Sequence, residues 1–125
     1  MPAVLPRPLK LTRSMRLSEG RNYRQLRLEG RRLVAGSLIL NWQPLPPGAT
    51  PRLGVITSRQ VGPAVVRNRA RRLLREAFRL HQHDLSQPVA MVLVGRRSLA
   101  GRDFAGVERD YLRALQMATL LKKTS

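Results

Sequence analysis

Cysteine is absent from the 125 residues of this chain, and acids are scarce, with 7 Asp and Glu against 24 Lys and Arg. Without cysteine the chain can form no disulfide, no thiolate zinc site and no cysteine nucleophile. The few acids are scattered, so no paired-carboxylate set or two-metal cluster is apparent, and His81 and His83 have no paired acids near them. We therefore expect a polypeptide that holds no metal or cofactor and performs no chemistry of its own.

A long hydrophobic run is also missing. The longest, Val89–Val94, is far shorter than the roughly 20 residues that span a membrane. At the N-terminus basic residues interrupt the apolar ones, so the continuous core of a secretory signal is absent. An Arg-rich start is typical of organelle transit peptides too, but Pro2, Pro6 and Pro8 oppose the amphipathic helix that these form. We expect residues 1–15 to be a flexible basic arm of a cytoplasmic protein that binds no membrane.

Arginine is the abundant residue: it supplies 21 of the 24 positive charges and leaves a net charge of +17. Such an excess repels itself unless a polyanion is the natural partner. Guanidinium groups suit phosphate because they keep their charge and donate paired hydrogen bonds to its oxygens. A GC-rich genome would also favour Arg over Lys, so the placement of the arginines matters more than their number. The 42% of hydrophobic residues still allows one domain with a buried core.

Turn residues and hydrophobic periodicity predict a single α+β domain. Alternation over 33–42 predicts strand structure with a turn or bulge at Gly36. Trp42 shares a face with Leu38 and Leu40 and is expected in the core, whereas Asn41 lies on the other face. Helices are predicted over 18–28, 64–81 and 103–121, and further strands over 52–57 and 89–94.

The helix over 64–81 is the most informative segment because its charged and apolar residues separate onto two faces. At about 100° per residue, four polar residues fall within roughly 40° of one another on the helix surface and form a stripe. The opposite side of the helix is apolar. The flanks carry Arg67, Arg69 and Arg71, with Arg71 nearest the stripe. Glu76 is the only acid in the segment, too few to neutralise its arginines. The stripe consists of Asn68, Arg72, Arg75 and Arg79, and the apolar side of Val66, Ala70, Leu73 and Ala77, widened by Leu74 and Leu80.

A row of guanidinium groups on one helix face predicts a phosphate-binding surface. Neighbours on such a face are about 5–6 Å apart, close to the phosphate spacing along a nucleic-acid strand. A merely solvated helix face normally mixes both signs of charge. Asn68 within the row either bonds locally or contacts RNA. The Gly62-Pro63 pair before the helix is explained by the turn alone, although a phosphate at the helix N-terminus is also physically plausible.

The run from Ser58 to Phe78 resembles the signature of the bacterial ribonuclease P protein subunit. The matching residues are a basic residue and a glycine, then Ala-Val, Arg-Asn-Arg, a basic pair and Arg-Glu. The similarity extends to Arg16-Leu17, Tyr23 and Gly30, and so covers roughly residues 16–116. In this chain the signature positions are Arg59, Gly62, Ala64-Val65, Arg67-Asn68-Arg69, Arg71-Arg72 and Arg75-Glu76.

The resemblance implies a four-stranded sheet packed with three helices in the order αβββαβα. It also implies a left-handed βαβ crossover around the Arg-Asn-Arg helix, against the usual preference. Residues 16–121 would form the domain and 122–125 a tail. The implied function is that of the protein partner of a catalytic RNA, which with Mg²⁺ removes the 5′ leader from precursor tRNA. The partners implied are therefore the catalytic RNA and precursor tRNA, and no DNA.

The resemblance also implies two sets of site residues. The family often has aromatics where this chain has Arg27 and Asn41, so leader stacking is expected to be weaker or replaced by guanidinium stacking and hydrogen bonds. Gln60 replaces the second basic residue before the glycine, and Pro63 replaces a common asparagine. The catalytic RNA would be bound by Arg67, Asn68, Arg69, Arg71, Arg72, Arg75 and Arg79, and the leader by Tyr23, Arg27, Asn41 and Arg59.

Three other classes of protein share some of these features. A ribosomal or other structural RNA-binding protein is equally small and basic. An architectural DNA-binding protein is disfavoured because no dimer motif or base-reading recognition helix is evident. A self-sufficient nuclease would have to cut RNA without an RNA subunit. Stimulation of leader cleavage by the ribonuclease P RNA excludes a ribosomal protein, and cleavage without that RNA would identify a nuclease. Competition between duplex DNA and structured RNA separates the DNA-binding class.

Overall fold

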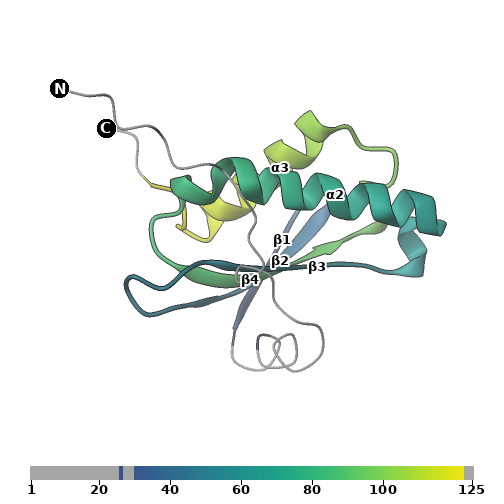
Figure 1. Cartoon of the computed structure of the whole chain (residues 1–125). Helices are drawn as coiled ribbons and strands as arrows, with labels where there is room; N and C mark the ends of the chain where they lie inside the picture. The colour runs from purple at the N-terminus through teal and green to yellow at the C-terminus, as the bar shows by residue number, and fades with distance from the viewer. Residues whose placement is uncertain (1–25, 27–29, 123–125) are drawn as a thin grey trace, which may run out of the picture.

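Four strands form one mixed sheet, and two helices cover one of its faces (Figure 1). The computed structural model describes Leu26 and residues 30–122. The predicted first helix therefore lies outside the described residues, except for Leu26, which is helical. No helix in the described part of the chain is long and apolar enough to cross a membrane. The elements are β1 (Arg31–Ala35), β2 (Leu38–Pro44), β3 (Arg52–Thr57), η2 (Arg59–Val61), α2 (Ala64–His81), η3 (Gln82–Asp84), β4 (Val89–Gly95), η4 (Arg97–Leu99) and α3 (Phe104–Met117).

The strand region over 33–42 folds as a hairpin whose turn is Gly36-Ser37. Ala35 pairs with Leu38, and Gly36 has φ +56°, a conformation that glycine adopts without steric cost. A Cβ on Gly36 would also lie 2.4 Å from Oδ1 of Asp110. The turn predicted at this position is thus confirmed, and two constraints require glycine there.

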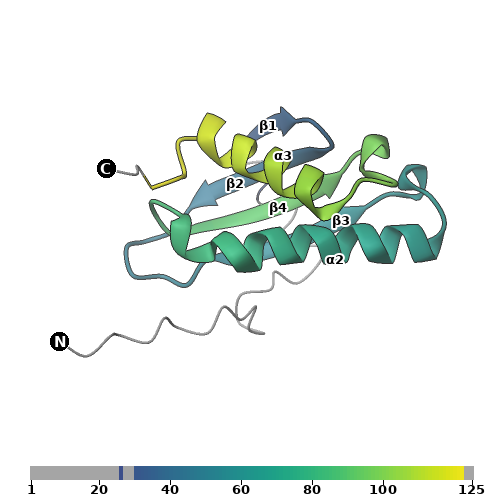
Figure 2. The ribbon, with the colours of Figure 1, turned by 90° about the horizontal axis from the view of Figure 1, so that it is seen from above.

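The sheet order is β1-β2-β4-β3, so β3 forms one edge and β4 lies inside. β3 and β4 are parallel and α2 connects them, whereas β1, β2 and β4 pair antiparallel. Seen from the helix side in Figure 2, the chain passes from β3 through α2 to β4 in the left-handed sense, which parallel connections rarely take. This topology places α2 above the β3 edge of the sheet, with α3 beside it over β1 and β2.

The main core lies between the sheet and the two helices. Alternate residues of each strand point into it, as the period of two predicts, and Trp42 is among them. β4 is buried on both faces, which its unbroken apolar sequence predicted. The largest fully buried side chains of this core are Leu38, Leu40, Leu74, Phe78, Met91, Leu93, Leu99, Tyr111, Leu115 and Leu120.

A second apolar cluster covers the opposite face of the sheet. Leu26 packs there against Ala90 and Val92 of β4. Gly30 lies four residues later in the chain, and its N–H donates to the Leu26 carbonyl at 2.8 Å. A Cβ on Gly30 would lie 2.5 Å from that carbonyl oxygen and 2.8 Å from that of Trp42, so only glycine fits this close approach.

Helix α3 ends at Met117, four residues before the predicted end at Leu121. Thr119 has φ +58°, and two hydrogen bonds close the end: Leu120 N–H to Leu115 C=O, and Thr119 N–H to Gln116 C=O. This is the Schellman pattern, in which the left-handed residue is usually glycine. Leu120 returns to the core beside Leu115, so the periodicity continues past the point where the helix stops.

Replacing Thr119 with Gly is expected to stabilise the fold by about 0.5–1 kcal/mol, because a β-branched residue is strained at positive φ. The gain is measurable as a shift in urea unfolding at constant slope. Thr119→Ala removes the branch but keeps the Cβ, so it should give a smaller change. A Gly variant less stable than the Ala variant would contradict the prediction.

Candidate nucleic-acid interface

Helix α2 has the predicted bounds, but its buried face is rotated from the predicted one. Its buried residues are Ala70, Leu74, Ala77 and Phe78, whereas Val66 and Leu73 of the predicted apolar side are only partly buried. The rotation follows from the position of α2 above the β3 edge, because Phe78 and Leu74 fill the space over the sheet. As a result, one basic flank of the helix lies against the strand edge.

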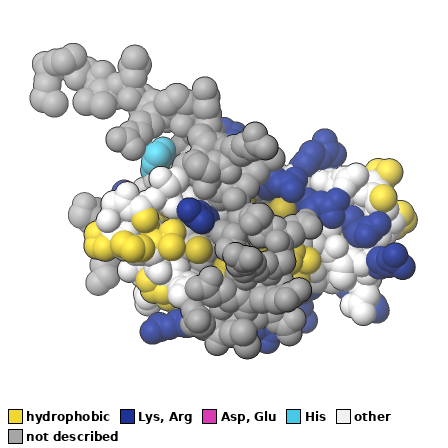
Figure 3. Space-filling view, turned by 60° about the horizontal axis from the view of Figure 1, so that its bottom comes forward, with side chains coloured by type: hydrophobic (Ala, Val, Ile, Leu, Met, Phe, Trp, Pro, Cys, Tyr) yellow, Lys and Arg dark blue, Asp and Glu magenta, His cyan; other side chains and the backbone are white. Residues whose placement is uncertain are grey.

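The predicted RNA-binding residues differ in exposure. Asn68, Arg69 and Arg72 are exposed, and the other four are half-buried. In Figure 3, Lys and Arg side chains gather at the end of the molecule where α2 begins, and no described acidic side chain is visible on that face. The half-buried residues are Arg67, Arg71, Arg75 and Arg79.

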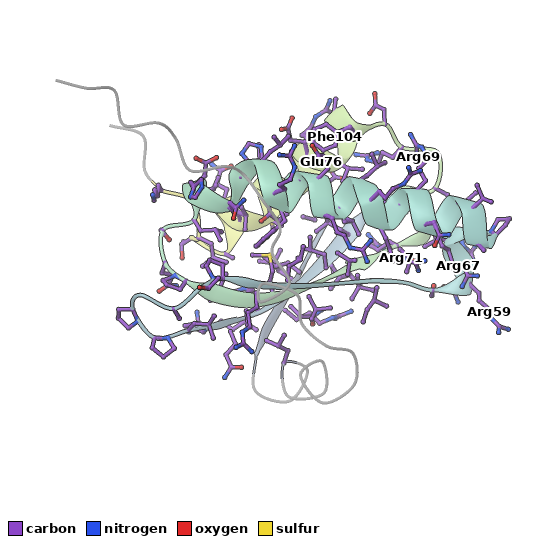
Figure 4. All side chains as sticks on the ribbon, viewed as in Figure 1. Arg59, Arg67, Arg69, Arg71, Glu76 and Phe104 are labelled. Atoms are coloured by element: carbon purple, nitrogen blue, oxygen red, sulfur yellow. The ribbon has the colours of Figure 1, made fainter. Side chains whose placement is uncertain are left out.

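Arg71 lies on the flank that faces β3 (Figure 4). Its Nη1 donates to Oγ1 of Thr57 at 2.9 Å, and its Nη2 donates to Oδ1 of Asn68. Thr57 is the last residue of β3 and is 8% exposed. Sequence reasoning did not identify Thr57, because nothing in its type or position marks a strand-end threonine as a partner of the helix.

The other flank faces α3. Arg69 points to that side, and its Nη1 donates to the Arg102 carbonyl at 3.0 Å. Arg67 lies beside η2, and its Nε is buried without a hydrogen-bond partner among the described residues. Arg59 is exposed at the same end of the molecule, pointing away from the body. The basic side chains thus spread around the first turns of α2 and do not form a single line.

One arginine of the row is partly neutralised. Arg79 donates from Nε to Oε2 of Glu76 at 3.0 Å and from Nη2 to Oε1. This hydrogen bonding lowers the pKa of Glu76 and raises that of Arg79. The pair lies near the surface, where such contacts contribute little to stability. Glu76 therefore limits the charge of the row only at its C-terminal end.

The other described acids lie on η3 and near or within α3, and each has a hydrogen-bond partner among the described residues. His81 contacts Oδ2 of Asp84 and Oε2 of Glu108, both at 2.8 Å. Burial by itself would lower the pKa of His81, but the hydrogen bonds to the two carboxylates outweigh it and raise the pKa above its ordinary value. Asp103 caps α3 by accepting from the N–H of Gly106.

Asp110 is 5% exposed and accepts hydrogen bonds from both the backbone N–H and the hydroxyl of Ser37, at 3.0 and 2.6 Å. Arg102 adds a third from Nη2. Burial would raise the pKa of Asp110, but these hydrogen bonds hold it below the ordinary value. No ion pair between described residues reaches Arg67, Arg69, Arg71 or Arg72.

Only two of the four predicted leader-binding residues can be placed. Tyr23 and Arg27 lie outside the described residues. Asn41 is on the sheet face opposite the helices, as predicted, opposite Val92 of β4 and 4% exposed. Arg59 follows β3, at the end where α2 begins. A leader contact by these four residues stays a prediction.

The basic helix, carried on a left-handed crossover of a four-stranded sheet, has counterparts in known proteins. The family model of ribonuclease P matches residues 11–119. The chain belongs to the ribonuclease P protein family. The ribonuclease P protein component of Syntrophomonas wolfei is 31% identical over 115 residues, which cover 92% of this chain and 96% of that protein. The component from Gluconacetobacter diazotrophicus is 35% identical over 107 residues, 85% and 92% of the two chains.

Solved structures of ribonuclease P proteins share the fold. The Staphylococcus aureus protein gives a TM-score of 0.78 at 18% identity, over 86% of this chain and 98% of that chain. The Thermotoga maritima protein gives 0.72 at 26% identity, over 82% and 96%. The fold implied by the signature, including the four-stranded mixed sheet, is thereby confirmed.

Proposed function

We propose that this protein is the protein subunit of ribonuclease P and that it binds the catalytic RNA of the enzyme through the exposed side of α2. In this proposal the RNA, with Mg²⁺, cleaves precursor tRNA and releases the 5′ leader. Family membership supports the role in tRNA 5′ processing. The observation that carries the RNA-binding surface is the cluster of Arg67, Arg69, Arg71 and Arg72 on α2, none of which forms an ion pair with another described residue.

The contribution of the protein is electrostatic and positional. Catalytic RNA and precursor tRNA repel each other, and arginines between them offset that repulsion while releasing condensed counterions. Affinity for RNA should therefore fall steeply with salt, with a log–log slope of about −0.7 to −0.9 for each phosphate contact. The leader would be guided by Asn41 and Arg59 together with Tyr23 and Arg27, the set that the family signature implies.

The experiment is reconstitution with the ribonuclease P RNA of the same organism. Leader release from a precursor tRNA is followed at low Mg²⁺, with protein alone and RNA alone as controls. We expect the protein to raise the rate at low Mg²⁺ and the difference to shrink at high Mg²⁺, which replaces protein charge in screening the two RNAs. Cleavage by the protein alone would identify a nuclease, and absence of stimulation would favour a structural RNA-binding protein.

A further inference from the structure

Thr57 and Arg71 together determine how the exposed side chain of Asn68 is oriented. Arg71 is half-buried between α2 and the end of β3, and it donates to two acceptors from the two ends of its guanidinium group. One acceptor, Oγ1 of Thr57, belongs to the sheet and is almost buried. The other, Oδ1 of Asn68, belongs to an exposed side chain one turn earlier on the helix. Arg71 therefore connects Thr57, which is held in the sheet, to the exposed side chain of Asn68.

The hydrogen bond to Asn68 fixes the orientation of its amide. An asparagine side chain has one carbonyl oxygen and one amino group, which can exchange places by rotation about the last bond. Because Arg71 can only donate, it selects the orientation in which the oxygen faces inward. The two N–H donors of the amino group are then left for an outside acceptor. In this orientation Asn68 suits phosphate, sugar or carbonyl oxygens.

We infer that Arg71 is a positioning residue, held by Thr57, that turns the Asn68 amino group toward an acceptor oxygen of the bound RNA. The inference rests on the proposed function and specifies how one residue of that surface works. It also separates Arg71 from exposed arginines such as Arg72. Arg71 contributes to binding mainly by orienting the Asn68 amide, whereas Arg72 contacts phosphate directly.

The planar guanidinium is suited to this task. It offers donors at several fixed angles, so it can reach a threonine and an asparagine together, whereas a lysine presents all its donors at one nitrogen. Thr57 is fixed because it pairs with Gly95 at the end of the parallel β3–β4 ladder. Its hydrogen bond to Arg71 therefore holds the guanidinium group in place. Loss of the Thr57 hydroxyl would leave Arg71 charged but free to turn away.

The test changes Thr57, which bears no charge and lies under the helix. Thr57→Val keeps the shape and removes the hydroxyl, and Thr57→Ser keeps the hydroxyl. We expect the Val variant to bind the catalytic RNA about fivefold more weakly, the loss of one well-placed hydrogen bond, and the Ser variant to bind within about twofold of wild type. The salt dependence should stay the same in both, because neither change removes a cationic contact to phosphate.

A double-mutant cycle shows whether the effect passes through the amide. Asn68→Ala alone should weaken binding about as much as Thr57→Val, and in the Ala background the Val change should have little further effect. Arg71→Lys should behave like Thr57→Val. If Arg71 instead contacts phosphate directly, Arg71→Gln will lower the salt slope by about 0.7–0.9.

Unchanged binding by Thr57→Val, or independent multiplication of the Val and Ala effects, would overturn the inference. Circular dichroism and urea unfolding of each variant identify any loss of fold. Arg72→Glu serves as the reference for the proposed function itself. If Arg72→Glu weakens RNA binding while Thr57→Val does not, the surface stands and the positioning role falls. If Arg72→Glu also binds like wild type, the proposed surface is wrong.

Discussion

Charge reversal of Arg72 together with Arg75 is expected to weaken binding of the catalytic RNA by about 100-fold or more at ~0.1 M salt. Arg72 is exposed and Arg75 half-buried on the α2 surface, and each contact from a charged donor to phosphate contributes about 1.5–3 kcal/mol. Two such contacts would be replaced by repulsion. Filter binding or fluorescence anisotropy across a salt series measures the loss, and the salt slope should fall by about 1.4–1.8.

The matched control reverses Arg109 and Arg113, which are exposed on α3 and change the net charge by the same amount. We expect a loss of less than about tenfold from this pair, because exposed charges beyond a Debye length, about 10 Å at 0.1 M salt, are largely screened. Arg102 would be a poor control because it hydrogen-bonds to Asp110. Equal losses of RNA affinity from both pairs would mean that α2 contributes only non-specific positive charge and makes no specific phosphate contacts.

Replacing Asp110 with Ala is expected to cost about 3 kcal/mol of unfolding free energy. The change removes one acceptor from three donors, including the backbone N–H of Ser37 in the hairpin turn, and leaves Arg102 without its carboxylate. Urea unfolding at pH 7 measures the loss. Asp110→Asn keeps the shape and one acceptor, so its loss should be smaller. An Ala variant as stable as wild type would show that the buried network adds nothing.

The same network predicts a pH dependence. The folded-state pKa of Asp110 lies below that of an ordinary aspartate, so the carboxylate contributes stability that is fully present above the ordinary aspartate pKa of about 3.9. The contribution is lost as the pH falls toward and through the folded pKa. The difference in unfolding free energy between wild type and Asp110→Asn should therefore be largest near pH 7 and shrink below about pH 4. A difference that is constant from pH 7 to pH 3 would contradict this.

The sequence predicted the elements well where periodicity and turn residues agree. The bounds of β3 and α2 match the prediction, and Gly36 is the turn it was expected to be. The end of α3 was missed because a threonine, not a glycine, occupies the left-handed position. No residue type in the sequence therefore indicated where the helix ends. The left-handed crossover was available only from the family signature, because local patterns carry no information about handedness.

The site was predicted less completely than the fold. A helical wheel separates charged from apolar residues, but it cannot tell how far the helix is rotated against the sheet. That rotation brings Arg71 to Thr57, a contact between residues fourteen positions apart in different elements. The pairing of Arg79 with Glu76 follows ordinary helix spacing, yet the composition alone suggested a row that stays unpaired.

The positions of the acids also affect how the protein meets its partner. No Asp or Glu occurs between residues 30 and 75, a stretch that includes β3, η2 and the first three turns of α2. The described acids lie beyond it, on the last turns of α2, on η3 and on or beside α3. Among the described residues, the side formed by β3 and the first turns of α2 therefore attracts a polyanion more strongly than the side that carries η3 and α3. Such a difference turns the protein during diffusion so that many collisions begin with the basic side forward, which raises the association rate at low ionic strength.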